Sequence, residues 1–222
     1  MTVSFEEARR RMVEQQLVAR GIVDALVLAA MGKVPRENFL SARQAALAYR
    51  DGPLPIGEGQ TISQPYIVAR MTAALTLVPT DRVLEIGTGS GYAAAVLAEI
   101  AAEVYTVERL PVLAERARQR LAELGYVNVH VLTGDGTLGW PEHAPYDAIV
   151  ATAGGPRAPQ ALLDQLAIGG RLVIPLGSDL YEQRLVRIVR ATAEEYQHEE
   201  LEAVAFVPLI GAQGWPVGVS GS

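Results

Sequence analysis

The chain has 222 residues, of which half are hydrophobic, and its 19 Lys and Arg against 25 Asp and Glu give a formal net charge of −6. This length and composition predict one globular α/β domain with an appended segment and exclude a disordered chain. The acidic balance disfavours nucleic acid as the main partner, and the absence of cysteine excludes disulfides, zinc–cysteine sites and thiol catalysis.

The first 80 residues are predicted to form an extension of helices and loop. Ser4 and Glu7 make a capping box that opens a helix at Phe5, and Asp24 can cap the next helix. Further helices are predicted over Ala25–Met31, Ala42–Tyr49 and Tyr66–Leu77. Residues 51–65 are rich in proline and glycine, so this stretch is predicted to be a loop and not a strand.

From Arg82 onward, short apolar runs alternate with helical patterns. Strands are predicted over Val83–Ile86, Glu103–Glu108, Asn128–Leu132, Asp147–Thr152 and Arg171–Pro175, and helices over Tyr92–Ala101, Pro111–Leu124 and Pro159–Leu166. This alternation predicts a doubly wound, mostly parallel Rossmann-like sheet that occupies residues 81–210. Arg184–Ala191 and Ala203–Pro208 are expected to add an antiparallel hairpin at its edge. The glycine-rich tail, residues 211–222, is predicted to be mobile beyond Trp215.

A glycine turn between the first strand and its helix predicts a nucleotide-type site. The strand runs directly into Gly87, Gly89 and Gly91, and Glu108 closes the next strand. Glycines allow a tight turn and close approach of a ligand. A carboxylate about 20 residues beyond the first glycine is placed to accept hydrogen bonds from both hydroxyls of a ribose. The chain is therefore expected to bind a nucleoside-bearing cofactor.

The spacing of the glycines favours S-adenosylmethionine over a dinucleotide. Tyr92 occupies the place of the third glycine in the dinucleotide fingerprint, where bulk disfavours a pyrophosphate. Glu85 adds a second negative charge beside Glu108, which suits a cofactor with a sulfonium and an ammonium group. Asp135 and Gly136 end the third strand, where the acid could accept from an adenine amino group or simply form an Asp-Gly turn.

Other catalytic chemistries find little support in the sequence. The histidines, His130, His143 and His198, are scattered, and no metal-ligand spacing or hydrolase Ser elbow is present, so no metal is expected. Methyl transfer to a carboxylate would need no general base, because that acceptor is already ionised at neutral pH. Residues 1–20 lack an apolar signal core and no apolar run is long enough to span a bilayer. We therefore expect a cytoplasmic protein without a membrane contact.

Two segments together resemble the bacterial protein-L-isoaspartate O-methyltransferases. They are the loop LPIGEGQTISQP at 54–65 and the glycine motif VLEIGTGSGY at 83–92. The resemblance covers roughly residues 10–215, and the loop is its most specific part, because methyltransferases in general share only the glycine motif. It implies methylation of the α-carboxyl of L-isoaspartyl residues in damaged proteins, with S-adenosylmethionine as the cofactor. The resulting ester then collapses to a succinimide.

The resemblance also implies roles for individual residues. Ser63 matches the active-site hydroxyl, although alone it could equally be a helix N-cap. The positions matched to cofactor contacts are Gln60, Thr61, Ile62, Gly87, Gly89, Gly91, Glu108, Asp135, Gly136 and Gln213. The partners expected are isoaspartyl proteins and peptides, and the chain is expected to be monomeric. A methyltransferase of another acceptor class, or a non-catalytic nucleoside-binding protein, are the alternatives.

Overall fold

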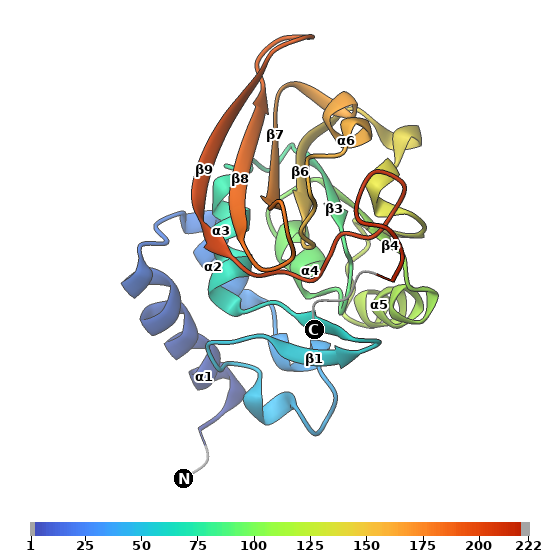
Figure 1. Ribbon diagram of the computed structural model, residues 1–222. Coiled ribbons are helices and arrows are strands. Elements are labelled where there is room, and N and C mark those ends of the chain that lie inside the picture. The colour runs from blue at the N-terminus through green and yellow to red at the C-terminus, as the bar shows by residue number, and fades with distance from the viewer. Residues whose placement is uncertain (1–2, 219–222) are drawn as a thin grey trace.

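The computed structural model describes residues 3–218, which build a seven-stranded sheet in the order β5-β4-β3-β6-β7-β8-β9 (Figure 1). The strands are β3 (Arg82–Ile86), β4 (Glu103–Glu108), β5 (Val129–Thr133), β6 (Tyr146–Ala151), β7 (Leu166–Leu176), β8 (Gln183–Arg190) and β9 (Tyr196–Val204). The five strands from β5 to β7 are parallel, and β8 and β9 are antiparallel. The carboxyl ends of the parallel strands therefore meet at one edge of the sheet.

Alternation along the strands divides the core into two layers. On β3, Val83 belongs to the layer covered by the helices of the extension and by α4 (Tyr92–Ala98), whereas Leu84 belongs to the layer covered by α6 (Gln160–Asp164). The remaining helix, α5 (Pro111–Glu123), packs on β4 and β5. Because both faces are covered, the central strands are almost continuously apolar, as expected for a parallel sheet.

The extension contains α1 (Phe5–Met12), α2 (Ala25–Lys33) and α3 (Pro65–Ala74), joined by short π and 3-10 turns. Both predicted N-caps are confirmed, since the Ser4 hydroxyl accepts from the Glu7 amide and the Asp24 carboxylate accepts from two amides of α2. Within the described residues the reciprocal half of the capping box does not form, because the Glu7 carboxylate accepts from Arg10 and Arg11 instead. The helix predicted over Ala42–Tyr49 is wrong. Only a 3-10 turn, Ala45–Leu47, forms in this segment, between turns on either side. A short stretch gains little from helical hydrogen bonds alone, so tertiary contacts decide its conformation.

The predicted loop at residues 51–65 contains a β-hairpin, so that prediction is also wrong. Strands β1 (Leu54–Gly57) and β2 (Gln60–Ile62) pair antiparallel around a two-residue turn. The turn residues Glu58 and Gly59 both have positive φ, 52° and 68°, which is the backbone geometry of a type I′ hairpin. This hairpin forms a sheet of its own and lies beside the carboxyl edge of the main sheet (Figure 1).

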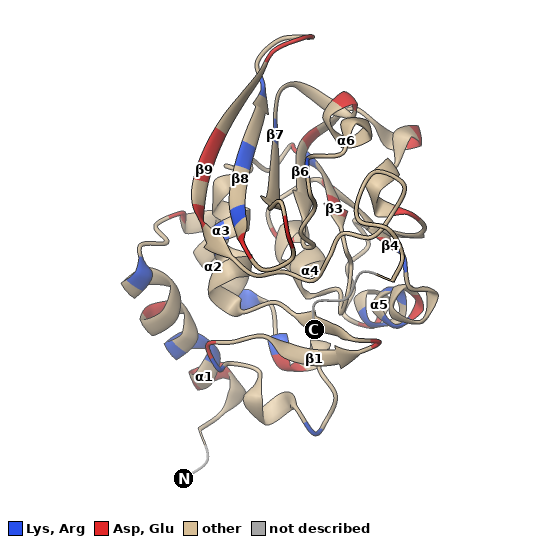
Figure 2. Cartoon of the chain, viewed as in Figure 1, with Lys and Arg blue, Asp and Glu red and all other residues tan. Residues whose placement is uncertain are grey.

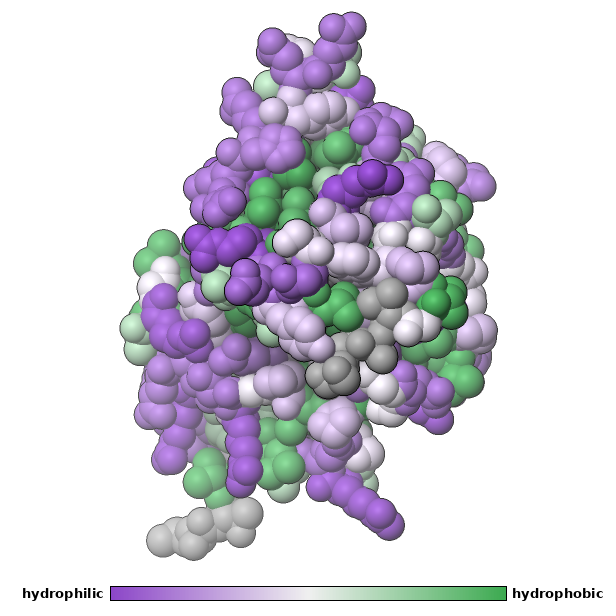
Figure 3. All heavy atoms as spheres, viewed as in Figure 1, coloured by the Kyte–Doolittle hydropathy of each residue, from purple (hydrophilic) through white to green (hydrophobic). Residues whose placement is uncertain are grey.

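The predicted antiparallel hairpin at the sheet edge exists, but its second strand is Tyr196–Val204 and not Ala203–Pro208. This strand was missed because it lacks apolar alternation. Instead, its glutamates face arginines of β8, with ion pairs from Arg187 to Glu199 and from Arg184 to Glu200 (Figure 2). Hydrophilic residues also cover the projecting end of the hairpin (Figure 3). Such charges protect an edge strand from pairing with other chains.

The segment after β9 returns across the sheet edge. Gly154 pairs with Pro208, and the Trp215 indole donates to the Gly154 carbonyl at 3.0 Å. The tail predicted to be mobile beyond Trp215 reaches residues 219–222, which lie outside the described residues. None of the described helices is both long and apolar enough to cross a membrane.

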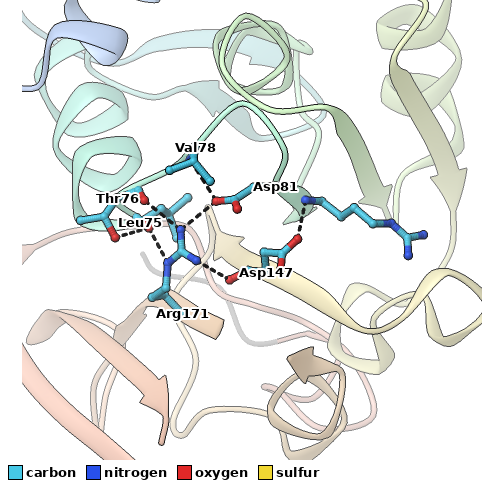
Figure 4. A network of polar contacts seen from close by, with 7 residues as sticks. Leu75, Thr76, Val78, Asp81, Asp147 and Arg171 are labelled. Carbon is cyan, nitrogen blue, oxygen red and sulfur yellow. Dashed lines mark hydrogen bonds and ion pairs between the residues drawn. The ribbon is translucent and has the colours of Figure 1, made fainter. Parts of the chain in front are cut away.

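The guanidinium of Arg171 joins the extension to the sheet at the edge opposite the carboxyl ends of the parallel strands (Figure 4). Arg171 of β7 donates to the carbonyls of Leu75 and Thr76, which follow α3, and to the carbonyl of Asp147 on β6. It also makes an ion pair with Asp81 at 2.8 Å, in which the two side chains are only 16% and 7% exposed. The end of α3 is thereby fixed to β6, β7 and the residue before β3.

We expect Arg171→Met to lower the free energy of unfolding by about 3 kcal/mol, because it leaves the buried Asp81 carboxylate without its counter-charge. The matched control is Arg184→Met, whose partner Glu200 is 66% exposed and whose loss should cost less than about 1 kcal/mol. Urea unfolding followed by circular dichroism measures both. Equal losses in the two variants would contradict a structural role for the Arg171 contacts.

Candidate active site at the carboxyl edge of the sheet

A cleft of about 810 Å³ opens at the carboxyl ends of β3, β4 and β6. One wall consists of the hairpin and the start of α3, residues 59–67, and another consists of residues 202–210, at the end of β9 and after it. The floor is made by the glycine turn and the ends of the three strands. Topology places a ligand site at this edge in open α/β sheets. The cleft therefore lies where the sequence predicted a cofactor.

The glycine turn after β3 has positive φ at all three glycines, and at Gly87 it also leaves no space for a side chain. Gly87 has φ of +95°, and a Cβ added there would lie 2.5 Å from the Thr152 hydroxyl oxygen. That hydroxyl donates to the Gly87 carbonyl at 2.8 Å. Gly89 also has positive φ and faces Ile56 of the hairpin. Gly87 and Gly89 line the cleft, whereas Gly91 precedes α4 and packs against Leu121.

Glu108 is held at the end of β4 by backbone amides. Its Oε2 accepts from the Gly89 amide at 2.9 Å, and its Oε1 accepts from the Leu110 amide at 3.0 Å. The side chain is 6% exposed and lines the cleft. A carboxylate oxygen has two acceptor sites, so each oxygen retains one for a ligand. The residue can therefore fix the glycine turn and bind two hydroxyls at the same time.

Glu85 is fully buried behind the glycine turn and is not part of the cleft wall. Its Oε2 accepts from the Thr106 hydroxyl at 2.6 Å, and Thr106 in turn contacts the Thr88 hydroxyl at 2.6 Å. Oε1 has no partner within the described part of the chain. The pKa of the Glu85 carboxyl is raised to about 8, chiefly by burial and also by the nearby Glu108 charge, whereas the Thr106 hydrogen bond lowers it.

The residues matched to the family's loop lie on β2 and just after it. Gln60, Thr61 and Ser63 line the cleft, whereas Ile62 points into the core with 4% exposure. The N-cap of α3 is Gln64, not Ser63, so the Ser63 hydroxyl is not used for capping. Among the described residues this half-buried hydroxyl has no hydrogen-bond partner. It is therefore available to a ligand.

Asp135, the acid after β5, is hydrogen-bonded to the tail. The Asp135 carboxylate accepts from the amide and hydroxyl of Thr137 and from the Ala212 amide at 2.7 Å, and only the neighbouring Gly136 lines the cleft. The Gln213 side chain accepts from the Ala161 amide at the start of α6, also outside the cleft wall. Both residues therefore anchor the tail in this structure. Their predicted contacts with a cofactor stay predictions.

Comparisons with known proteins agree with the geometry. The family profile of the protein-L-isoaspartate(D-aspartate) O-methyltransferases matches residues 7–214. The chain belongs to this family.

Two similar relatives are bacterial proteins of the same name. The chain is 62% identical to protein-L-isoaspartate O-methyltransferase 2 of Pelobacter propionicus, over 95% of this chain and 93% of that protein. It is 63% identical to protein-L-isoaspartate O-methyltransferase 1 of Geotalea uraniireducens, over 96% and 97%. The resemblance noted in the sequence is therefore confirmed.

Solved structures support the fold. A protein-L-isoaspartate O-methyltransferase superposes with a TM-score of 0.84 at 30% identity, covering 93% of this chain and 67% of that one. A Plasmodium falciparum protein provisionally assigned to the same family, in complex with S-adenosyl-L-homocysteine, gives 0.77 at 26% identity, covering 91% and 98%. The predicted doubly wound, mostly parallel sheet is confirmed.

Sequence reasoning missed several residues of the cleft wall. Arg20 and Gln64 come from the extension, and Glu202 and the residues after β9 come from the far end of the chain. No local motif marks Arg20 or Glu202, and only the fold brings them to the strand ends. The three histidines lie outside the cleft wall: His143 stacks on Tyr105, and His130 pairs with Glu103.

We expect Glu85 to make the stability of this methyltransferase depend on pH. An acid whose folded pKa is raised, here from 4.5 to about 8, stabilises the fold fully below pH 4.5. That contribution is lost as the pH rises towards 8. The free energy of unfolding of the wild type should therefore fall relative to that of Glu85→Gln by on the order of 4 kcal/mol between pH 5 and 8.5. Urea titrations at several pH values measure it. Parallel curves for the two proteins would show that Glu85 does not titrate in this range.

Proposed function

We propose that this chain transfers a methyl group from S-adenosylmethionine to the free α-carboxyl of L-isoaspartyl residues in damaged proteins. The observation that supports it most directly is one cleft lined by both Glu108, anchored by two backbone amides, and the unpartnered Ser63 hydroxyl. The first suits a ribose, and the second suits an anionic acceptor. Membership of the family supplies the acceptor class.

The residues of the cleft fit a nucleoside cofactor. Gly87 and Gly89 provide a cradle that a Cβ would fill, and the Glu108 oxygens keep acceptor sites for both ribose hydroxyls. Gly136 leaves room beside Ile86, which a Cβ at that position would contact at 2.5 Å. Gln60 and Thr61 line the same cleft. We assign these residues to cofactor binding.

When bound, S-adenosylmethionine supplies a methyl group on a positively charged sulfur, which an acceptor oxygen takes as the carbon–sulfur bond breaks. No proton moves, because the acceptor carboxylate is already ionised at neutral pH. The chain's task is therefore to align the acceptor and exclude water. We assign to Ser63 a hydrogen bond that it donates to the carboxylate, holding one oxygen in line for attack. The product ester then collapses to a succinimide.

The extension, residues 1–80, is proposed to act as the cover of the active site and to receive the peptide, since it contributes a whole wall of the cleft. Residues 81–210 are proposed to supply most of the cofactor site, together with Gln60 and Thr61 of the extension. The partners proposed are isoaspartyl proteins and peptides. The net charge of −6 argues against nucleic acid. A cytoplasmic location and a monomeric state stay predictions from the sequence.

The test of this function is a methyl-transfer assay with radiolabelled S-adenosylmethionine and two peptides that differ only in an L-isoaspartyl or an aspartyl residue. We expect transfer to the isoaspartyl peptide and background counts for its twin, because only the former presents a free α-carboxylate on the shortened side branch. Equal labelling of both peptides, or of neither, would rule out the proposed acceptor.

We expect Ser63→Ala to slow methyl transfer by about one to two orders of magnitude, since a charge-assisted hydrogen bond contributes roughly 1.5–3 kcal/mol. Calorimetry should show cofactor affinity close to that of the wild type. Ser63→Thr should retain much of the activity, because it keeps the hydroxyl. Ser41→Ala, which removes a hydroxyl outside this cleft, serves as the control. Full activity in Ser63→Ala would remove the serine from the mechanism.

A further inference from the structure

The active-site cleft contains two positively charged side chains, Arg20 and Arg109, among its lining residues. Arg109 directly follows Glu108, so it belongs to the side of the cleft assigned to the ribose. Arg20 ends the 3-10 turn Val18–Arg20 in the extension and is therefore the cation on the side of Ser63. The predictions from the sequence gave this residue no role.

Arg20 is positioned by contacts that lead, through Asp51, to the residue after Ser63. Its guanidinium carbon lies 3.4 Å from the centroid of the Tyr66 ring, and its Nη1 lies 3.2 Å from Oδ2 of Asp51. Oδ1 of Asp51 accepts from the Gln64 amide group at 2.7 Å, and Gln64 is the residue after Ser63. Within the described residues, Nε and Nη2 of Arg20 have no hydrogen-bond partner. The guanidinium of Arg20 can therefore donate to a second carboxylate through Nε and Nη2.

We propose that Arg20 binds the acceptor carboxylate by donating to the oxygen that is not methylated, while Asp51 limits the strength of that contact. The inference rests on the proposed function, because it assumes an anionic acceptor at Ser63. Planar donors of arginine match a carboxylate better than an ammonium does. The contact with the Tyr66 ring restricts the movement of the guanidinium, which reduces the entropy lost on binding.

The chemistry of the step explains why a fully free cation would be unfavourable there. The acceptor begins as an anion and ends as a neutral ester, so its charge decreases on the way to the transition state. A cation beside it therefore stabilises the bound substrate more than the transition state, which improves binding and slows transfer. The Asp51 carboxylate offsets part of the Arg20 charge. Arg20 should thus act on KM for the peptide and Asp51 should oppose it.

The experiment measures kcat and the peptide KM for Arg20→Gln and Asp51→Asn with an isoaspartyl peptide. We expect Arg20→Gln to raise KM on the order of tenfold, a modest value because the side chain is 41% exposed, with kcat unchanged or slightly higher. Asp51→Asn should lower both KM and kcat by about threefold. Both variants break the same ion pair, so a merely structural pair would shift KM in the same direction in each.

Arg43→Gln, which removes an exposed arginine of the extension outside the cleft, is the matched control and should leave both constants unchanged. Arg20→Lys should restore only part of the binding, because it keeps the charge and loses the planar fork. An unchanged KM in Arg20→Gln, or a higher KM in both ion-pair variants, would overturn the proposal. Absence of transfer by the wild type would instead contradict the proposed function, so the two failures are distinguishable.

Discussion

The active site depends on a contact made at the opposite edge of the sheet. Arg171 fixes the carbonyls of Leu75 and Thr76 at the end of α3 and pairs with the buried Asp81. Since α3 is a rigid helix of ten residues, fixing its last turn also fixes its first. Ser63 and Gln64 precede that first turn, so their distance from the strand ends is determined by packing along the whole helix. The extension and the sheet therefore behave as one unit.

The second determinant of the active site is the Glu108 carboxylate, which both fixes the glycine turn and lines the cleft. Glu108 closes the glycine turn through the Gly89 amide, and the same oxygens face the cleft. A turn with positive φ at successive glycines has little conformational preference of its own, so an acceptor at the next strand end supplies the missing constraint. Such double use explains why the acid must lie at the end of β4, where the parallel register brings it beside the turn.

What could be predicted from the sequence was local in the chain or periodic. The strand–turn–helix around Gly87 and the acid of β4 follow from apolar periodicity and glycine spacing, and both were placed correctly. The hairpin β1–β2 was missed because Pro55 and several glycines hid its short strands, and the Glu58-Gly59 turn lacks the usual asparagine. Strand β9 was missed because arginine–glutamate pairs replace its apolar face. The roles of Arg171 and Arg20 could not be predicted from the sequence. Three partners of Arg171, namely Leu75, Thr76 and Asp81, lie 90 to 96 residues away along the chain, and the contacts of Arg20 are set by tertiary packing.

The distribution of charge in the cleft agrees with a reaction that removes charge. A sulfonium and a carboxylate react to give a neutral thioether and a neutral ester. Strong fixed charges next to the reacting atoms would therefore stabilise the ground state more than the transition state and slow the transfer. The group assigned to the attacking oxygen is accordingly a neutral hydroxyl, Ser63. The acid nearest the turn on the buried side, Glu85, has a pKa raised to about 8 by burial and is mostly uncharged at neutral pH. Arg20, the cleft cation on the side of Ser63, is paired with Asp51. On that side of the cleft the positive charge is thus partly compensated, which lets alignment determine the rate.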